Sequence, residues 1–377
     1  MIRLTSAGES HGKALIGILE GLPSNLEIDI DEVNGYLALR QSGYGRGFRQ
    51  KIETDRMEIL SGVRNRLTLG SPLAFWVRNA DYENWRPYMA PEGCDVTKKR
   101  LTRVRPGHAD LTGAKKFDQT DARNILERAS ARETAVRVAA GSVCRQFLAK
   151  LGVQIGGYVR TVCGITDEKE YTFEELASVK SRPLFMPDDE KQAAAMRRID
   201  ELKAAGDTAG GILEIRVKGL KSGFGSCMTY GEKLDGRLVG AMLSVQAVKG
   251  AEVGMGFGVG LRPGSKVHDA IYFEDGKFVR KTNNAGGIEG GMSNGEEIVL
   301  RAAMKPIPTL MSGLDTVDYV THEKQTAAAE RSDVASVCAC EIILESVVAT
   351  VLAQVVSERL GGDNMREVMK RYEELPQ

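Results

Sequence analysis

The hydrophobic pattern of the chain is most regular between residues 121 and 152. Apolar or small residues recur there mostly three or four positions apart, which is the spacing of one buried helical face: Ile125, Ala129, Val136, Ala139, Val143, Phe147 and Leu151. Asp121 is placed to cap the first turn, and Gly152 follows the last apolar position, where a left-handed residue commonly ends a helix. We therefore predict one helix over this stretch, packed into the core.

Further helices and strands follow from the same kind of pattern. Helical spacing is found over residues 29–39, 234–248 and 333–360, with Asp333 as a natural N-cap of the last helix and Gly361 after its end. Strand-like runs occupy residues 1–5, 51–77, 153–162, 210–217 and 297–304. The segment 166–205 is charged and partly helical, and we assign it no chemistry. Together the elements predict a protein of mixed α and β structure.

Glycine alternates with apolar residues between positions 253 and 261. A strand with this pattern would carry its side chains on one face and bare backbone on the other. We predict such a strand here, with a closely packed helix against the glycines. The spacing does not match G-x-G-x-x-G, and no P-loop occurs in the chain, so the sequence favours neither a Rossmann fold nor an NTPase.

Composition narrows the class of protein. The 377 residues allow one large domain or two, and 42 glycines indicate many tight turns or close backbone approaches. The 51 basic residues are balanced by 51 acidic ones, which argues against a general nucleic-acid binder but permits local basic clusters for a small anion. The six cysteines show no zinc-like spacing, so we expect free thiols in a reducing compartment and no metal site. No secretory leader or run of about 18 apolar residues is evident. We expect a cytosolic, soluble protein.

Two of the four histidines stand in turns that suit chemistry. His11 follows Ser10 in GESHG, between two glycines, and His108 lies in RPGHAD. A histidine presented in such a turn can hold or give a proton near neutral pH, although an ordinary turn is the plain alternative. A Ser-His neighbour pair is a weak indication of serine-protease chemistry, because adjacent side chains diverge. An acid or phosphate contact is the better interpretation.

Arginines are concentrated in two places. The loop RQSGYGRG contains Arg40 and Arg46, and Arg128 and Arg132 are spaced to project from one side of the predicted central helix, with the Ser130 hydroxyl nearby. Arginine suits phosphate and carboxylate because its planar fork donates two charge-assisted hydrogen bonds. A solvated helix face, or an RGG-like nucleic-acid segment at the first loop, are the alternatives.

Three loops complete the candidate regions. The Gly/Asn-rich segment 282–295 can point its amides into a concavity, which suits phosphate or a polar ring edge. The segment 305–309 is stiffened by two prolines, which place Lys305 and Thr309 on a rigid frame. The aromatic and proline-containing stretch 79–95 is expected to be a long irregular loop that serves as a lid or an interface.

Seven motifs together resemble the chorismate synthase family. They run in the family's order over nearly the whole chain: GESHG at 8–12, RQSGYGRG at 40–47, RPGHAD at 105–110, ERASARET at 127–134, TNNAGGIEGGMSNG at 282–295, MKPIPT at 304–309 and ERSD at 330–333. The family binds reduced FMN and converts 5-enolpyruvylshikimate 3-phosphate to chorismate and phosphate by an anti-1,4-elimination without net redox change. The resemblance therefore implies a carbon–oxygen lyase of the shikimate pathway, which serves aromatic amino acid biosynthesis.

The resemblance also implies roles for individual residues. His11 assists departure of the phosphate as an acid, His108 protonates or supports the reduced flavin near N1, and Asp333 hydrogen-bonds or relays a proton at N5. Ser10, Arg40, Arg46 and Arg132 are the implied substrate contacts. The implied flavin contacts are Arg128, Ala129, Ser130, Gln246, Ala247, Gly290, Lys305, Pro306, Ile307, Pro308, Thr309 and Arg331. The family usually has Ser at position 129 and Asn at position 246, so these two side-chain roles differ here.

The fold implied by the family is α+β, a β-α-β sandwich with central helices between antiparallel sheets. It implies a single domain over residues 1–377 and a cytoplasmic homotetramer that binds a small-molecule substrate, with no nucleic acid or membrane partner. NADPH is a possible reductant, but we expect an outside donor to reduce the flavin. The alternatives from other classes are a flavin-dependent oxidoreductase, which would consume reductant in proportion to product, and a non-catalytic phosphate- or RNA-binding protein.

Overall fold

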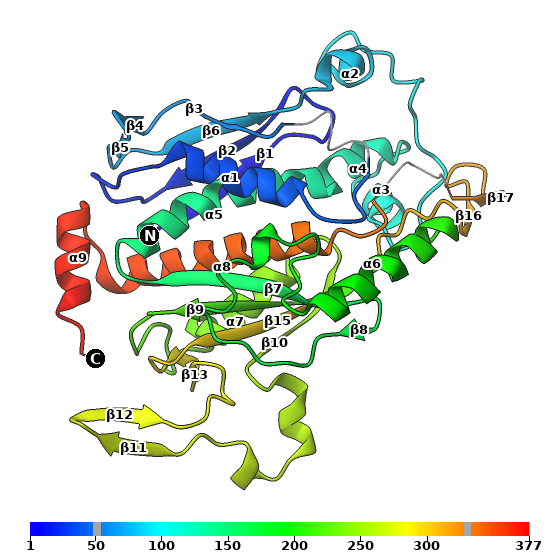
Figure 1. Cartoon of the computed structure of the whole chain (residues 1–377). Coiled ribbons are helices and arrows are strands. Elements are labelled where there is room, and N and C mark those ends of the chain that lie inside the picture. Colours follow the sequence, from blue (N-terminus) through cyan, green and yellow to red (C-terminus); the bar gives the residue numbers. More distant parts are fainter. Residues whose placement is uncertain (48–53, 328–332, 377) are drawn as a thin grey trace.

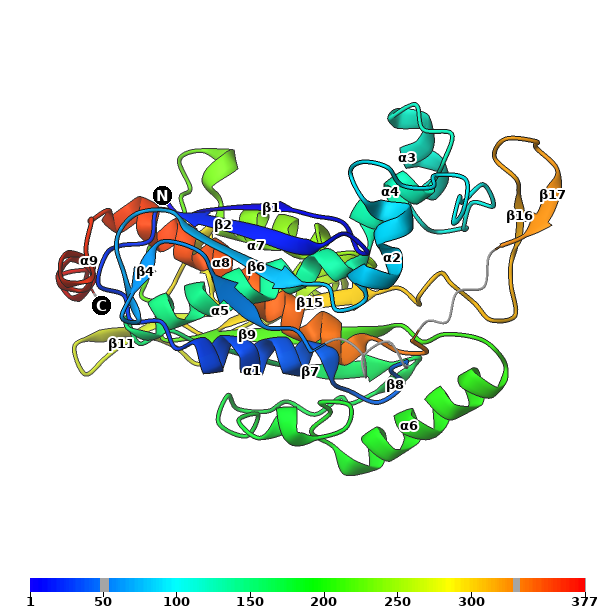
Figure 2. The same ribbon diagram turned by 90° about the horizontal axis from the view of Figure 1, so that it is seen from above.

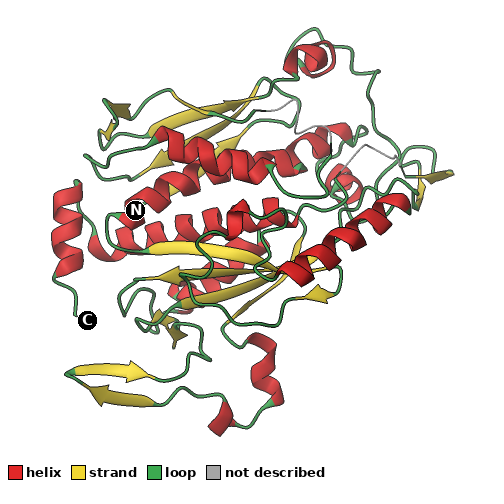
Figure 3. Ribbon diagram, in the orientation of Figure 1, coloured by secondary structure: helices red, strands yellow, loops and turns green. Residues whose placement is uncertain are grey.

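Two antiparallel sheets enclose a layer of helices in the computed structural model, which describes residues 1–47, 54–327 and 333–376 (Figures 1 and 3). The first sheet has the strand order β1-β2-β6-β3 and the second β10-β15-β9-β7-β8. The α+β sandwich implied by the family resemblance is thereby confirmed.

The first sheet is built by strict alternation of side chains. Its strands are β1 (Arg3–Ala7), β2 (Ala14–Glu20), β3 (Met57–Ile59) and β6 (Leu73–Arg78). On β2, Leu15 and Leu19 are buried while Ile16 and Ile18 face outward, as the period of two requires. Gly17 leaves the space that the Phe75 ring fills, because a Cβ there would lie 2.2 Å from that ring. The inner face of this sheet therefore packs flat on the helices.

The second sheet is larger and carries charge on its outer face. Its strands are β7 (Gln154–Val162), β8 (Ile165–Thr166), β9 (Gly211–Lys218), β10 (Val248–Val253) and β15 (Ile298–Met304). Leu213, Ile215 and Val217 of β9 are buried in the hydrophobic core, and Glu214 and Arg216 alternate with them on the opposite face.

The enclosed helices are α1 (Ile30–Gln41), α5 (Thr134–Ala149), α7 (Leu234–Leu243) and α8 (Val337–Leu360). Helix α5 packs on the first sheet, α8 packs on β7 and β9, and the two helices pack on each other. Gly141 makes this approach possible, because a Cβ there would lie 2.4 Å from the Ser346 carbonyl oxygen. Helix α8 is long and apolar enough on average to cross a membrane, although Glu341 and Glu345 interrupt its apolar run, and 89% of its apolar window is buried inside the protein. Its composition is that of a central core helix.

The remaining elements surround the sandwich (Figure 2). The helices are α2 (Tyr82–Met89), α3 (Asp110–Lys116), α4 (Arg123–Ala129), α6 (Asp189–Ala204) and α9 (Met365–Glu373). The hairpins are β4–β5 (Val63–Arg64 and Leu67–Thr68), β11–β12 (Ile271–Glu274 and Lys277–Arg280), β13–β14 (Ile288–Glu289 and Met292–Ser293) and β16–β17 (Asp315–Val317 and Lys324–Thr326). The stretch 79–95, expected to be an irregular loop, thus contains a helix.

The prediction of a single helix over residues 121–152 is wrong for the first third of this range. Ser130 has an extended conformation, with φ −62° and ψ 141°, and separates α4 from a 3-10 turn (Ala131–Glu133) and α5. The Ser130 hydroxyl accepts a hydrogen bond from the Arg132 backbone N–H, an N-cap that competes with helix continuation. Arg128 and Arg132 therefore do not project from one side of a common helix. Gly152, by contrast, has the predicted left-handed conformation.

The strand predicted over the alternating glycines is also wrong. Strand β10 ends at Val253, and Gly254 and Gly256 have φ values of +58° and +56°, which take the chain out of the extended region. A 3-10 helix (Gly256–Leu261) follows. Phe257 and Leu261 are 85% and 87% exposed, so this segment presents apolar side chains to its surroundings rather than to the core.

Candidate functional site

The sequence-predicted loops other than 282–295 gather at one end of the sandwich. The turn after β1, the end of α1, the α4–α5 junction, the end of β15 and the start of α8 all lie toward α2, α3 and β16 in Figure 1. Each loop follows or precedes a buried element, so the core fixes where its side chains stand.

His11 is held by a buried carboxylate and an indole ring. Nδ1 of His11 lies 2.9 Å from Oε1 of Glu127, and its backbone N–H donates to Oε2 at 2.8 Å. The imidazole stacks on Trp85 with 3.9 Å between ring centroids. Burial opposes ionisation of Glu127, but the hydrogen bonds and charge of His11, together with Arg123, lower the pKa of that carboxyl below its usual value. Glu127 is therefore a carboxylate that orients the histidine.

His108 is paired in the same manner with Asp110. Nδ1 lies 2.5 Å from Oδ1 of Asp110, whose Oδ2 accepts from Nε of Arg105 at 2.8 Å. Asp110 is fully buried, which opposes its ionisation, but His108 and Arg105 outweigh burial and hold the pKa of Asp110 well below its usual range. Gly107 in the turn has φ +73° and its carbonyl accepts from Nζ of Lys305. The turn thus joins His108 to the proline-stiffened segment.

Glu133 links several of the predicted cofactor residues. Its Oε1 accepts from the Ser6 hydroxyl at 2.8 Å, and that hydroxyl in turn accepts from Nη2 of Arg128 at 2.9 Å. Its Oε2 lies 3.5 Å from the amide nitrogen of Gln246. The next residue, Ala247, has a left-handed backbone with φ +70°, and its carbonyl accepts from the Lys305 N–H at 2.9 Å. Arg128, Gln246, Ala247 and Lys305 are therefore in one cluster.

Arg40 and Arg132 share one buried carboxylate. Asp55 accepts from Nη1 of Arg40 at 3.1 Å and from Nη1 of Arg132 at 2.5 Å. Burial lowers the pKa of Arg40 to about 10, although Asp55 opposes the change. Arg132 also donates to Asn79, whose amide holds the Gly12 carbonyl at 2.7 Å. The two arginines thus stand beside the histidine turn, but they are fixed to protein acceptors rather than presented on a flexible loop.

Asp333 does not cap α8 as predicted. Its Oδ2 lies 2.8 Å from Nη1 of Arg46 and accepts from the Ser336 hydroxyl at 2.8 Å, while Oδ1 accepts from the Gly47 N–H at 2.6 Å. Burial lowers the pKa of Arg46, and the charge of Asp333 opposes this. Asp333 therefore links the loop that contains Arg46 and Gly47 to the start of α8, which begins at Val337.

The other residues that the family resemblance implies as substrate or flavin contacts differ in their burial and in their partners. Ser10 is buried, and its N–H donates to the Glu127 carbonyl. Thr309 is also buried, and the Ile307 carbonyl accepts from Thr208 at 2.8 Å. Pro308 packs at the Gly107 turn. Arg331 lies outside the described residues.

Gly290 is the one described residue that the chain does not bring to this cluster. It lies in the β13–β14 hairpin, next to Gly291, whose carbonyl accepts from the first residue of α7, Leu234. Gln246 and Ala247 follow the other end of that ten-residue helix. At a rise of 1.5 Å per residue, the helix alone separates the two ends by about 15 Å. The grouping of Gly290 with the other cofactor residues is therefore not found within one chain.

Sequence reasoning missed the acidic partners and one aromatic residue. Glu127 and Glu133 lie inside ERASARET and Asp110 lies inside RPGHAD, but the cations of these motifs gave the stronger signal. Buried carboxylates beside Arg or His are expected wherever such cations are held below the surface. Asp55 carried no sequence signal, and Trp85 was included only in the expectation of a lid or an interface over 79–95, because both residues reach the site only through the fold.

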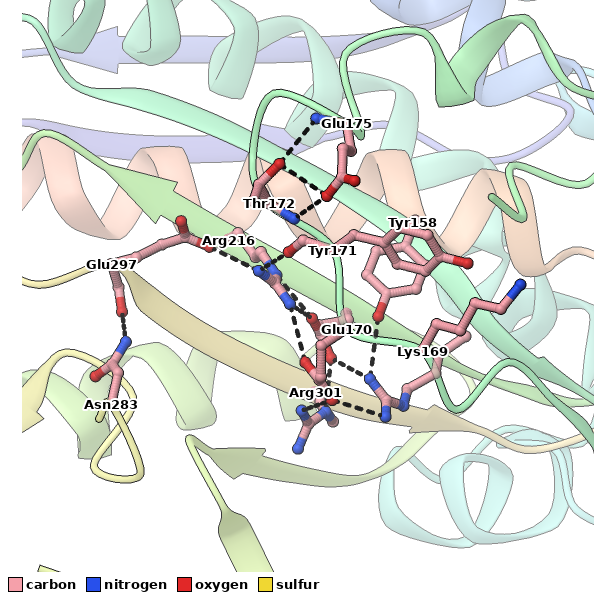
Figure 4. A network of polar contacts seen from close by, with 12 residues as sticks. Tyr158, Lys169, Glu170, Tyr171, Thr172, Glu175, Arg216, Asn283, Glu297 and Arg301 are labelled. Atoms are coloured by element: carbon pink, nitrogen blue, oxygen red, sulfur yellow. Dashed lines mark hydrogen bonds and ion pairs between the residues drawn. The ribbon is translucent and has the colours of Figure 1, made fainter. Parts of the chain in front are cut away.

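A second charged cluster lies on the outer face of the five-stranded sheet (Figure 4). Glu214 accepts from Arg160, Arg216 and Arg301 at 2.7–3.0 Å. Glu170 pairs with Arg160 and Arg216, and Glu297 pairs with Arg216. All of these residues except Glu214 line part of a depression of about 500 Å³. Three guanidinium groups are thus matched by three carboxylates. The candidate segment 282–295 reaches this depression through Asn283 and Asn284, but none of the described catalytic, substrate or flavin residues implied by the family lies there. This cluster is better explained as a structural ion network than as the candidate site.

Comparison with known proteins shows the family of the chain. The family model for chorismate synthase matches residues 2–356. The chain belongs to the chorismate synthase family. It is 48% identical to the chorismate synthase of Caldicellulosiruptor bescii, with 99% of each chain aligned. It is 50% identical to that of Thermus thermophilus, covering 99% of this chain and 98% of the relative. A crystal structure of chorismate synthase superposes with a TM-score of 0.79 at 39% identity, over 99% of this chain and 96% of that one.

The comparisons confirm the family resemblance drawn from the motifs and, with it, the assignment to the carbon–oxygen lyases of the shikimate pathway. Because the family resemblance implies a reduced flavin, the cluster can be tested for such a group. The Gln246 amide oxygen is buried and has no hydrogen-bond partner among the described residues. It is an acceptor that a ligand N–H or O–H could satisfy. The left-handed backbone at Ala247 and the half-exposed Arg128 lie beside it, so these residues fit a flat polar ring with an anionic tail.

Proposed function

We propose that this chain eliminates phosphate from 5-enolpyruvylshikimate 3-phosphate to form chorismate, with reduced FMN bound at the end of the sandwich. The observation that carries the proposal is the convergence of two carboxylate-paired histidines with five cations from three segments of the chain: Arg40 and Arg46, Arg128 and Arg132, and Lys305. A substrate with one phosphate and two carboxylates needs such a set of cations. Departure of phosphate also needs a proton donor.

The flavin-holding residues in this proposal are Arg128, Ala129, Ser130, Gln246, Ala247, the segment 305–309 and Arg331. When bound, reduced FMN supplies electron density to the breaking carbon–oxygen bond and returns to its starting redox state. Arg128 and Lys305 supply positive charge for an anionic tail, and Gln246 supplies the unpartnered amide oxygen. Ala129 offers only main-chain groups where the family usually has a serine hydroxyl.

His11 acts on the leaving group in this proposal. Glu127 is ionised and can only accept, so the hydrogen between the two residues is on Nδ1 of His11. In the imidazolium form of His11, Nε2 also carries a hydrogen, and this is the proton that passes to the departing phosphate oxygen, which leaves the neutral imidazole with its hydrogen on Nδ1. Ser10 is next to this histidine, and Arg132 is held beside the turn through Asn79. Arg132 would offset the negative charge that accumulates on the phosphate, and the Ser10 hydroxyl would donate a hydrogen bond to it.

His108 and Asp333 serve the other proton transfers in this proposal. Asp110 fixes Nδ1 of His108 as a donor, so the imidazole is oriented before any ligand binds. Asp333 accepts three hydrogen bonds or ion pairs from Gly47, Ser336 and Arg46. It is placed to accept or pass a proton at the start of α8, and Arg46 and Arg40 hold substrate anions next to it.

The reaction is tested by incubating the purified protein with the substrate and reduced FMN, oxidised FMN or no flavin, and measuring chorismate and phosphate together. The proposal predicts equal release of both products with reduced FMN alone. Phosphate release without chorismate, or product formation without flavin, would contradict it. Salt-sensitive binding of a polynucleotide in place of turnover would favour the alternative of an RNA-binding protein.

We further propose a homotetramer of single-domain subunits in the cytoplasm, with the flavin reduced by an outside donor and NADPH as a possible reductant. Phe273 and Phe278 of the β11–β12 hairpin are 65% and 73% exposed, which is unusual for large apolar residues on an isolated monomer. If Gly290 contacts a flavin, a second subunit has to supply it. The six cysteines are unpaired, which suits a reducing compartment.

The assembly is tested by light scattering of the native protein and of a Phe273→Ser/Phe278→Ser double variant. We expect a mass of four chains for the native protein and a smaller assembly for the variant. A monomer that is active would contradict both the tetramer and the role of Gly290 across subunits.

A further inference from the structure

Helix α2 (Tyr82–Met89) is held to the protein without a hydrophobic anchor. None of its residues is buried, and Pro87 lies within its last turn. Most surface helices are held by an apolar face that packs into the core. The position of α2 must therefore depend on a small number of specific contacts with the rest of the chain.

The main such contact is made by Trp85. Its ring lies 3.9 Å from the His11 ring, at an interplanar angle of 26°, so the two are stacked. Its Nε1 donates to Oδ2 of Asp81, one turn earlier, at 2.9 Å. This bond fixes the rotation of the indole within the helix, so that its face is presented to the histidine rather than its edge.

Two cations also lie against the Trp85 ring. The Arg123 guanidinium carbon is 5.3 Å and the Lys99 nitrogen 5.2 Å from the ring centroid. Arg123 is one turn before Glu127 on α4 and pairs with it at 3.3 Å. The indole therefore contacts Arg123, which pairs with Glu127, and it also stacks on His11, which is hydrogen-bonded to the same carboxylate.

Glu127 and Trp85 constrain different motions of the imidazole. Nδ1 of His11 lies 2.9 and 3.0 Å from the two Glu127 oxygens, which fixes the direction of one ring edge but still allows the ring to rotate by small angles about its Cβ–Cγ bond. The stacked indole removes this rotation, because it fixes the plane of the imidazole. Both constraints are required if Nε2 is to point at one place.

We propose that Trp85 is a positioning residue for His11, and that α2 is the clamp that sets the plane of its imidazole. The inference rests on the proposed function, in which Nε2 of His11 delivers a proton to the leaving phosphate. Proton transfer depends on direction as well as distance, and a misplacement of about 1 Å can cost about 100-fold in rate. Trp85 contributes to turnover by restricting the imidazole and takes no part in the bond changes.

The kinetic test compares two substitutions at this position. Trp85→Leu removes the flat face and is expected to lower kcat by about 10- to 100-fold with little change in KM. Trp85→Phe keeps a stacking ring and is expected to recover most of that loss. Tyr88→Leu, on the same helix, is the matched control for a general disturbance of α2. Equal turnover for the Leu variant and the native protein, or no recovery with Phe, would overturn the proposal.

A fluorescence test is independent of turnover. The chain has only two tryptophans, so Trp76→Phe leaves Trp85 as the sole indole. A stacked imidazole quenches indole emission, so adding His11→Ala in this background is expected to raise the emission of Trp85. Unchanged emission would show that the rings are not stacked in solution, and the proposal would fall. If emission rises but the native protein forms no chorismate, the stack stands and the proposed function fails.

Discussion

Nδ1 of His108 lies 2.5 Å from Oδ1 of Asp110, and the second oxygen of the same carboxylate accepts from Nε of Arg105 at 2.8 Å. Asp110 is fully buried and Arg105 is nearly so. The aspartate thus has two functions, since it orients His108, the histidine proposed to serve the flavin, and neutralises a buried guanidinium. Its removal should affect both stability and turnover.

Asp110→Asn should lower the free energy of unfolding at pH 7 by roughly 3–5 kcal/mol, because it removes the carboxylate charge that pairs with the buried Arg105 guanidinium. The pKa of Asp110 is lowered in the folded protein, so its contribution is present above the unfolded pKa and is lost as pH falls through the folded value. Urea unfolding should therefore show a difference between native and variant proteins at pH 7 that narrows on acidification. Asp275→Asn, at an exposed carboxylate, is the control. A constant difference at all pH values would contradict this account.

For the pair Glu341 and Glu345 we predict the opposite dependence of stability on pH. These buried carboxylates lie on consecutive turns of α8 and share Lys180. Burial and the neighbouring Glu345 raise the pKa of Glu341 well above its usual value, with Lys180 opposing. A raised carboxyl pKa stabilises the fold at low pH, and this stability is lost as pH rises through the folded value.

Glu341→Gln should therefore become more stable than the native protein as pH rises above about 4.5, by up to about 1.4 kcal/mol per pH unit until the folded pKa is passed. Thermal unfolding between pH 5 and 9, written as a difference between the two proteins, is the measurement. Glu358→Gln, nearer the end of the same helix, should follow the native curve. A variant that loses stability relative to the native protein with rising pH would show that Glu341 is ionised in the fold.

His11→Ala and His108→Ala should each slow turnover by about 100-fold or more, because each removes a proton-transferring group. His268→Ala is a matched control, since that imidazole is exposed and lies outside the cluster. Initial rates of chorismate formation at saturating substrate and reduced FMN are the measurement. Near-native rates for either active-site variant would remove that histidine from the mechanism.

The left-handed backbone at Ala247 predicts an unusual order of substitutions. Ala247→Gly relieves the strain of a Cβ at φ +70°, so it should bind FMN normally and gain up to about 1 kcal/mol of stability. Ala247→Val places a branched residue at a positive φ, which branched residues rarely adopt. We expect the resulting distortion to cost about 1.4 kcal/mol of binding free energy, which lowers the affinity for FMN tenfold. Quenching of FMN fluorescence on binding measures both. Ala251→Val on β10 should bind FMN as the native protein does, and a tight-binding Ala247→Val would exclude this position from the flavin site.

The sequence was sufficient to predict the helices and strands whose hydrophobic periodicity is long and regular. Helix α1 begins after its Asp29 cap, β7 and β9 lie where alternation placed them, and α8 ends before a left-handed Gly361. The break at Ser130 was not predictable from apolar spacing, because the spacing continues through it while the serine hydroxyl redirects the backbone. At Ser130 the local hydrogen bond, and not the spacing of apolar residues, determines the backbone conformation.

The candidate site was predicted mostly as a set of cations and histidines. Their buried carboxylate partners could not be assigned, because Asp55 meets Arg132 across 77 positions of sequence and Glu127 meets His11 across 116. The position of Gly290 depends on the direction of α7 and β15, which only the assembled fold reveals. Motif resemblance was a guide to chemistry, and the three-dimensional structure was needed to show which groups hold that chemistry in place.

The central claim is an elimination that uses reduced flavin without consuming it. We would follow one anaerobic reaction with substrate in large excess over reduced FMN, recording chorismate, phosphate and the flavin absorbance together. The account predicts many equivalents of each product per flavin while the flavin stays reduced throughout. Product formation that stops at one equivalent per flavin, or that oxidises the flavin in proportion, would show an oxidoreductase and contradict it.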